Sequence, residues 1–334
     1  MNIKVFLLST LFFFSVSTTV YSESLDPPFM DKEVASLNSD ERLFLADNAS
    51  GNPTGTGNRD EIAQTDYSFS MGENWRGVFN PDSDIFPRYF ANPLRPMISL
   101  SRINLSESKI PGAGDNRYVF RLGGRYGFLR IHPTGESNRG FQLDLEGAFL
   151  GVFDIENSLD NIGWDGLYGI LFSWGNARGL ALKFGTKHDS SHVGDEYAES
   201  TGRKRINYTR EEVLLGISLA GFNYWRIYGE GAYAYDLRNK AVQERWRVEG
   251  GIEFQDAERW WDGSAGYYAA LDVTSYEEND WHPDVTIQAG LVLPVKKRFR
   301  TYRLGLEYHN GRPLIGEFFQ IKEKYFAIGL WMEL

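Results

Sequence analysis

A short stretch of the sequence, Lys187-His-Asp-Ser-Ser-His-Val-Gly-Asp-Glu-Tyr197, gathers residue types that can do acid–base and nucleophilic chemistry. Within it, His188 and Ser190 are two residues apart. In an extended strand such residues point to the same face, so the imidazole can act as a general base for the hydroxyl. This pair predicts hydrolysis of an acyl ester.

A third group is expected to orient the imidazole. In the stretch that follows Arg205, Asn207 and Glu211 share the parity of the apolar residues Val213 and Leu215. If this strand pairs with the one that carries His188, both side chains lie on the face of the imidazole. Asn207 is preferred because it lies closer to the end of its strand. The predicted catalytic residues are His188, Ser190, Asn207 and Glu211.

A second polar stretch, Tyr308-His-Asn-Gly-Arg-Pro-Leu-Ile-Gly-Glu317, lies near the C-terminus. Both stretches follow the ends of predicted strands, so we expect them at one rim of the fold. A hydrogen-bonded rim that only fixes the strand ends would use the same residues. The predicted rim cluster consists of Ser191, His192, Asp195, Glu196, His309, Arg312 and Glu317.

A metal site is an alternative use of the first stretch. His188 and His192 are four residues apart, and Asp195 and Glu196 follow them. Two histidines at this spacing bind zinc mainly when they lie on a helix, whereas the local pattern is a strand that runs into a loop. Calcium, held by Asp195, Glu196 and backbone oxygens, therefore fits better. No other cofactor is expected.

The elements that position these residues are strands. After Pro96 the sequence alternates between apolar and polar residues in pieces of about ten, separated by turn residues. The pattern predicts an all-β fold, an antiparallel transmembrane β-barrel of about twelve strands. The predicted strands are 97–106, 116–131, 138–153, 163–174, 179–190, 205–220, 223–237, 243–255, 263–276, 284–294, 300–309 and 318–334.

Composition agrees with a barrel. A mean hydropathy of −0.39 is too low for a bundle of membrane helices, yet 18 Tyr, 23 Phe, 9 Trp and 35 Gly are high for a soluble domain. The net charge of −10 argues against a nucleic-acid partner, and without cysteine the chain has no disulfide and no lipid-modified cysteine. Aromatic residues near predicted strand ends are expected at the level of the lipid headgroups. These are Tyr224, Trp225, Trp246, Trp260, Trp261 and Trp331.

The ends of the chain predict export to the outer membrane of a Gram-negative bacterium. Residues 1–22 have the layout of a cleaved signal peptide, with Lys4 before the apolar run 5–16. Residues 23–95 show no sustained period and predict a flexible periplasmic segment before the barrel, 96–334. The C-terminal ten residues resemble the signal that the barrel assembly machinery reads, although they end in Leu334 rather than Phe. Outer-membrane lipids and this machinery are the expected partners.

Several of these stretches resemble an uncharacterised bacterial family, the domain of unknown function 1207. They are the two polar stretches, Arg205-Ile-Asn-Tyr-Thr-Arg-Glu-Glu212 and Phe86-Pro-Arg-Tyr-Phe-Ala-Asn-Pro-Leu-Arg-Pro96. The resemblance extends from about Phe86 to the C-terminus. It implies an outer-membrane barrel and supplies no activity.

A local resemblance concerns activity. His188-x-Ser190 is similar to the His-x-Ser-Asn of outer-membrane phospholipase A and to the His-x-Ser of the barrel lipid A deacylase, with Ser191 in place of the Asn. It implies an esterase at the lipid interface that acts on phospholipid or lipid A. Two alternatives remain: a small channel, suggested by the lumen parity of Arg303 and Glu307, and a structural or interaction barrel without catalysis.

Overall fold

The computed structural model describes residues 68–108, 110–222, 224–260, 265–295 and 300–333. The predicted signal peptide and residues 23–67 of the predicted flexible segment lie outside these residues, as do Trp261 and Leu334. None of the described helices is long and apolar enough to cross a membrane.

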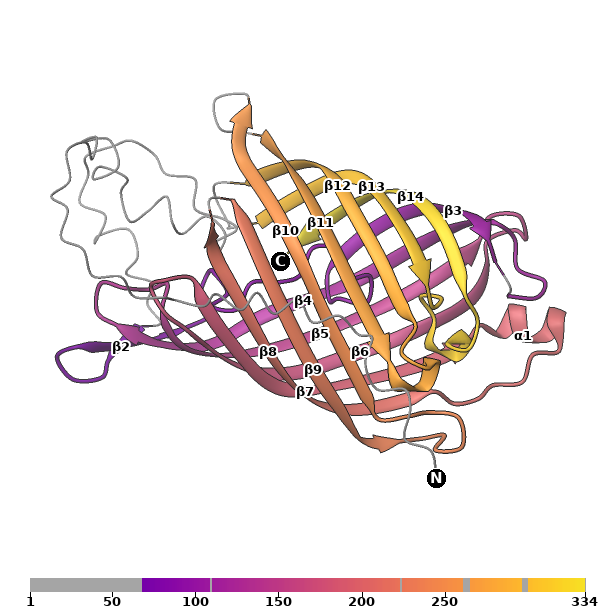
Figure 1. Cartoon of the computed structure of the whole chain (residues 1–334), viewed down its shortest axis with the longest axis horizontal. Coiled ribbons are helices and arrows are strands. Elements are labelled where there is room, and N and C mark those ends of the chain that lie inside the picture. The colour runs from indigo at the N-terminus through magenta and orange to yellow at the C-terminus, as the bar shows by residue number, and fades with distance from the viewer. Residues whose placement is uncertain (1–67, 109, 223, 261–264, 296–299, 334) are drawn as a thin grey trace, which may run out of the picture. The chain divides into compact units, whose positions relative to one another are not determined.

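Twelve antiparallel strands, β3 to β14, form a closed barrel (Figure 1). Each strand pairs with the next along the chain, and the pairing of β14 with β3 closes the ring. The predicted number of strands and their antiparallel order are confirmed. Their bounds are β3 Ile98–Glu107, β4 Asn116–Pro133, β5 Gly140–Asp154, β6 Asp160–Gly175, β7 Leu180–Val193, β8 Thr209–Phe222, β9 Trp225–Leu237, β10 Trp246–Trp260, β11 Ala265–Tyr276, β12 Pro283–Val295, β13 Arg300–Gly311 and β14 Glu323–Glu333.

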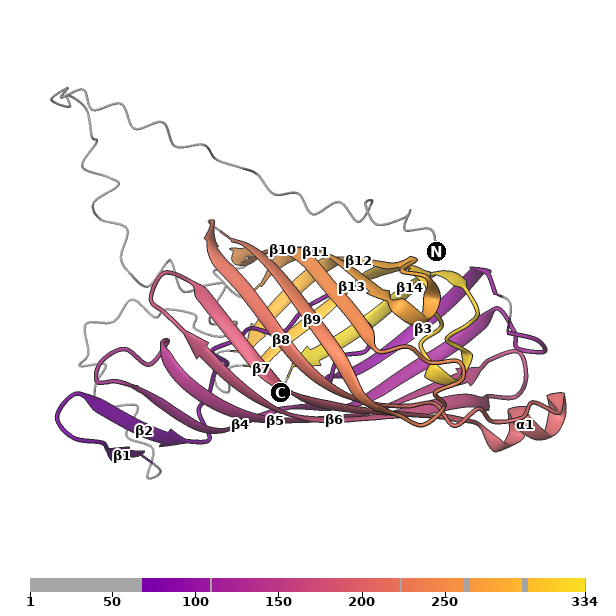
Figure 2. The same ribbon diagram turned by 60° about the horizontal axis from the view of Figure 1, so that its bottom comes forward.

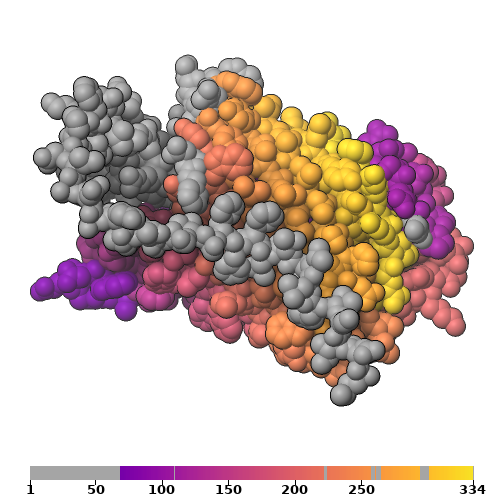
Figure 3. Space-filling model, in the orientation of Figure 1, coloured from indigo at the N-terminus to yellow at the C-terminus, as the bar shows by residue number. Residues whose placement is uncertain are grey.

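Side chains alternate between an apolar outer wall and a charged interior. Leu215 and Leu306 are 64% and 66% exposed on the outer wall, whereas Arg117, Arg226 and Arg303 are fully buried inside. This distribution is the reverse of a soluble protein and is typical of a transmembrane barrel. Figure 3 shows β10 to β14 as a continuous wall.

The two ends of the barrel differ. One end carries the helix α1, Asp195–Thr201, in the connection between β7 and β8, and we call it the α1 end. The other end carries a hairpin of β1, Ser68–Ser70, and β2, Trp75–Phe79, which extends the sheet beside residues 129–133 of β4 (Figure 2). A connection of four residues, 176–179, joins β6 to β7 at this hairpin end.

Residues 80–97 run inside the barrel and form a luminal segment. Tyr89 stacks on Tyr228 of β9 with ring centroids 3.8 Å apart, and its hydroxyl donates to Glu230 at 3.1 Å. The backbone N–H of Phe90 donates to Glu253 of β10 at 2.5 Å. Of the described part of the predicted segment 23–95, residues 68–70 and 75–79 therefore pair with the sheet, and residues 85–95 are mostly buried in the lumen.

Arginines of the inner wall hold the luminal segment by its backbone carbonyls. Because the segment forms no regular secondary structure, these carbonyls need partners when buried. The bonds run from Arg125 to Phe86 at 2.9 Å, from Arg226 to Pro87 at 2.9 Å, from Arg121 to Pro93 at 2.9 Å and from Arg303 to Phe90 at 3.2 Å.

An ion pair fixes the start of the luminal segment. Arg88 Nε donates to Asp84 Oδ2 at 2.7 Å, and an Arg125 nitrogen lies 3.8 Å from the same oxygen. Burial by itself would raise the pKa of Asp84, but the charges of Arg88 and Arg125 outweigh burial and hold this pKa below its ordinary value of 3.8. Asp84 is therefore charged at neutral pH.

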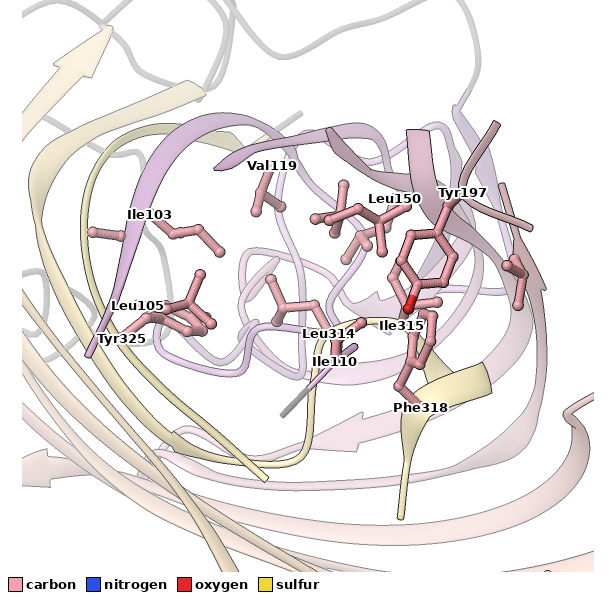
Figure 4. Close-up of a cluster of buried hydrophobic side chains, with 14 residues drawn as sticks. Ile103, Leu105, Ile110, Val119, Leu150, Tyr197, Leu314, Ile315, Phe318 and Tyr325 are labelled. Atoms are coloured by element: carbon pink, nitrogen blue, oxygen red, sulfur yellow. The ribbon is translucent and has the colours of Figure 1, made fainter. Parts of the chain in front are cut away.

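The connection 312–322 folds into the α1 end of the barrel. Its residues Leu314, Ile315 and Phe318 are buried and pack against inward side chains such as Val119 and Leu150 (Figure 4). The short 3₁₀ helix Gly316–Phe318 belongs to this connection. Residues 318–322 were predicted as the start of the last strand, but their apolar side chains enter the lumen as part of this cap instead.

Aromatic residues occur on the outer wall near both ends of the barrel, as predicted. Tyr224, Trp225, Trp246 and Trp260 are exposed there. Trp331 is an error in the prediction, because it is 1% exposed and points into the lumen. It shares the inward parity of Tyr325 on β14, which the alternation along the strand requires.

Candidate active site on the outer wall

His188 and Ser190 lie on the outer wall near the α1 end. Along β7, Leu182 and Phe184 are exposed, whereas Lys183 and Asp189 are buried in the lumen. His188 and Ser190 have the parity of the exposed residues, and no register shift interrupts the pairing of β7 with either neighbour. His188 and Ser190 therefore point out from the barrel, on the face that carries the exposed apolar side chains.

Glu211 is the residue that contacts His188. It lies directly opposite His188 on β8, and its Oε1 is 2.5 Å from His188 Nδ1. The histidine and glutamate side chains are 15% and 28% exposed, so water screens the contact only in part. A second carboxylate oxygen accepts from the Tyr235 hydroxyl at 3.5 Å.

This contact settles which nitrogen of the neutral ring can accept a proton. A carboxylate accepts hydrogen bonds and does not donate them, so Nδ1 carries the hydrogen and Nε2 keeps its lone pair. The ring of His188 also stacks on Tyr168 of β6, with centroids 4.3 Å apart and an angle of 17° between the planes. The ring is therefore held on one edge and on one face.

Ser190 lies beside a glycine. It pairs with Gly166 of β6, and its Oγ donates to the Gly166 carbonyl at 3.5 Å, which is a weak hydrogen bond. No hydrogen bond between Ser190 and His188 is formed among the described residues. The Ser190 hydroxyl is bonded to the backbone of β6 instead.

Asn207, the preferred third residue, lies outside this arrangement. It precedes β8, is exposed, and has a left-handed backbone with φ of 56°. Asparagine tolerates that conformation better than most residues. Of the two predicted partners, the structure brings Glu211 rather than Asn207 to the imidazole.

The first part of the predicted rim cluster divides between the two faces of the wall. His192 points outward and stacks on Trp164 with centroids 4.1 Å apart. Ser191 points inward, donates to Asp165 and accepts from the N–H of Glu317 at 2.8 Å. Neighbours in the sequence are thus on opposite faces, as strand geometry requires.

The rest of the cluster is structural. Glu317 is 1% exposed and accepts from the N–H groups of Ile206 at 2.7 Å and Tyr208 at 3.3 Å, so it ties the connection after α1 to the cap. Arg312 lies 2.7 Å from Glu278, and His309 donates to the Arg312 carbonyl at 2.9 Å. These contacts fix loops at the α1 end.

The predicted calcium ligands lie next to each other at the start of α1. Asp195 and Glu196 are exposed at the start of α1, and Asp195 pairs with Arg205. Among the described residues, no group of three or more His, Cys, Asp and Glu side chains is placed to hold a metal ion. The calcium site of two carboxylates and backbone oxygens stays a prediction.

Comparison with known proteins agrees with the barrel and places the chain in a family. The model of a family described as "Protein of unknown function (DUF1207)" matches residues 75–333. The chain belongs to this DUF1207 family. No curated protein matches the sequence. The family match confirms the resemblance stated from the sequence and gives no activity.

Two solved structures share the fold of this DUF1207 member. Outer membrane phospholipase A from Escherichia coli has a TM-score of 0.51 at 10% identity, covering 72% of this chain and 94% of that one. The outer membrane phospholipase dimer of Salmonella typhi with bound calcium has a TM-score of 0.50 at 11% identity, covering 71% and 91%. At these identities the likeness concerns the fold alone.

Proposed function

We propose that this barrel hydrolyses acyl esters of membrane lipids at its outer wall, with Ser190 as nucleophile, His188 as general base and Glu211 as the residue that orients His188. The observation that carries the proposal is the 2.5 Å contact between His188 Nδ1 and Glu211 Oε1 on an apolar wall. Polar side chains are costly on a lipid-facing surface, so a histidine bonded to a carboxylate there is a candidate for function. The two side chains supply the supporting members of a serine triad.

The reaction runs through an acyl-enzyme. His188 Nε2 takes the Ser190 proton as Oγ attacks the ester carbonyl carbon. The bond from this carbon to the alcohol oxygen breaks, and His188 returns the proton to the departing alcohol. Water then attacks the acyl-serine with His188 again as base, which releases a fatty acid and restores Ser190. Glu211 stabilises the imidazolium in both halves.

The likeness in fold is consistent with this activity, since both structural neighbours are outer membrane phospholipases. The same proposal places the protein in the outer membrane, with the α1 end on the extracellular side. It includes a cleaved signal peptide and insertion by the barrel assembly machinery. They rest on the apolar outer wall and the sequence of the two chain ends. The lipids would then belong to the outer leaflet.

The lumen that the described residues enclose is largely filled, which favours an esterase over a channel. The luminal segment occupies one end and the cap the other, and a cavity between them, lined in part by Lys187, Arg247 and Arg312, has a volume of about 30 Å³. A single water needs about 10–15 Å³ on this measure, so the cavity holds only a few waters. Conductance steps in planar bilayers would contradict this interpretation.

The proposal is tested by fatty-acid release from phospholipid and from lipid A by the purified full-length protein in mixed micelles, with calcium and with chelator. Ser190→Ala and His188→Ala should each abolish release. Ser106→Ala is the matched control, since Ser106 is an exposed outer-wall serine that donates to a strand carbonyl at 3.2 Å. Undiminished release by both active-site variants, or none by the wild type, would overturn the proposal.

A further inference from the structure

The surroundings of Ser190 have a regular pattern. Across β6 and β7, two stacked ring pairs flank one pair without rings. Phe149 of β5 stacks on Trp164 from the β5 side, with ring centroids 5.6 Å apart. We call the gap between the ring pairs the Gly166 notch. The three pairs, in order along the wall, are Trp164 with His192, Gly166 with Ser190, and Tyr168 with His188.

The glycine in the middle is not explained by backbone packing. Among the glycines of β6, an added Cβ would meet a neighbouring atom at 2.8 Å at Gly163, 2.5 Å at Gly169 and 2.8 Å at Gly175, so these positions exclude a side chain. At Gly166 the nearest atom would be Ser190 Oγ at 3.4 Å, which is ordinary contact. Its φ also lies outside the left-handed region that favours glycine.

A side chain at position 166 would stand beside the Ser190 hydroxyl. The Cα atoms of Trp164 and Tyr168 are about 13 Å apart in an extended strand. The Trp164 ring lies 3.9 Å from the place of a Cβ at position 166, so a larger side chain there would fill the remaining space between the two rings. The row across the wall is Phe149, Gly166, Ser190 and Thr209. This row is apolar on the β5 side, where a hydrocarbon chain can lie against Phe149. On the β8 side it carries the hydroxyls of Ser190 and Thr209.

We infer that the Gly166 notch is the binding site for the acyl chain of a long-chain lipid ester, with the ester carbonyl over Ser190 and the chain lying over Gly166 towards Phe149. This inference rests on the proposed function, because it gives that site its substrate class. Burial of the chain against Trp164, Tyr168 and Phe149 supplies apolar contact that a short acyl group lacks. Phospholipids and lipid A both carry such ester-linked acyl chains, so the inference does not specify the headgroup.

The test compares long-chain and short-chain hydrolysis in the same variants. Gly166→Leu fills the notch, Gly166→Ala adds one carbon at a permitted distance, and Gly231→Leu is the control. Gly231 is also exposed on the outer wall, and an added Cβ there would meet nothing within 4 Å. Each variant is assayed with a dipalmitoyl phospholipid, with lipid A and with a soluble activated acetyl ester.

We expect Gly166→Leu to lower hydrolysis of the two lipids relative to the acetyl ester by at least about tenfold, the effect of a misfitting carbon in an apolar site. The control should keep the wild-type ratio. If Gly166→Leu lowers hydrolysis of only one of the two lipids, that lipid is identified as the source of the acyl chain, and the inferred binding site is supported.

An unchanged ratio in Gly166→Leu would overturn the inference while the proposed function stands. Equal loss of all three substrates in both Gly166 variants would overturn it too, because the side chain would then act by disturbing Ser190. A wild-type protein that hydrolyses neither lipid nor acetyl ester would refute the proposed function, and the inference with it.

Discussion

Replacing Glu211 with Gln tests the arrangement of the site most directly. The change keeps the size of the side chain and removes the charge that faces His188 Nδ1 at 2.5 Å. A hydrogen bond to a charged group contributes about 1.5–3 kcal/mol. If that interaction strengthens as His188 becomes charged in the transition state, its loss slows hydrolysis about 10- to 150-fold at a factor of ten per 1.36 kcal/mol.

The assay is kcat for fatty-acid release in mixed micelles at saturating lipid, with folding checked by heat-modifiable migration on gels. Because Glu211 does not touch the substrate in this arrangement, KM should change little while kcat falls. Asn207→Gly is the matched control, since glycine accepts the φ of 56° and removes the other predicted partner. Full kcat in Glu211→Gln, together with a loss in Asn207→Gly, would refute the reasoning.

Three further predictions concern the interior. Glu253→Ala leaves the buried Arg226 charge without its carboxylate partner and should destabilise the barrel by about 3–5 kcal/mol in urea unfolding; a smaller loss would mean that water reaches the site. Glu317→Ala should increase protease cleavage within 203–208, because Glu317 accepts from the N–H groups of Ile206 and Tyr208, and unchanged cleavage would contradict that role. Because the folded pKa of Asp84 is depressed, its stabilisation is present above about pH 3.8 and is lost as the pH falls through the folded pKa. The difference in urea midpoint between wild type and Asp84→Asn should therefore narrow below that pH.

The strands could be predicted from the sequence because the two faces of a barrel wall have different surroundings, and the residue types differ accordingly. Outward-facing and lumen-facing residues alternate over most of each strand, so the period of two can be recognised in residues such as Leu215 and Ile217. Most predicted ends fall within a few residues of the observed ones. The larger errors occur where the alternating pattern continues beyond the strand. Phe318, for example, was included in the last strand, but its apolar side chain packs in the connection 312–322 that caps the barrel.

The common face of the proposed catalytic pair could be predicted for the same reason. His188 and Ser190 share a face whatever the barrel size, because their spacing along one strand fixes it. Their neighbours on β6 carry the same alternation, so Trp164, Gly166 and Tyr168 were readable as outward residues, but nothing in the sequence indicated that they lie beside Ser190.

Register between strands was decided only by the tertiary structure. A shift of the β7–β8 pairing by two residues would keep every face and replace Glu211 with another partner, so the sequence left Asn207 and Glu211 open. The conformation of the luminal segment was also decided only by the tertiary structure, since the sequence of residues 80–97 shows no hydrophobic periodicity. Their conformation comes from the arginines and glutamates of distant strands, which are brought together only when the barrel closes.

The sequence by itself thus determined the class of fold, the number of strands and the face on which each strand residue lies. These properties follow from hydrophobic alternation, which is local. The tertiary structure decided which residue orients His188, what fills the lumen and what borders Ser190. These depend on contacts between residues far apart in the chain, and pairing register and chain closure set them.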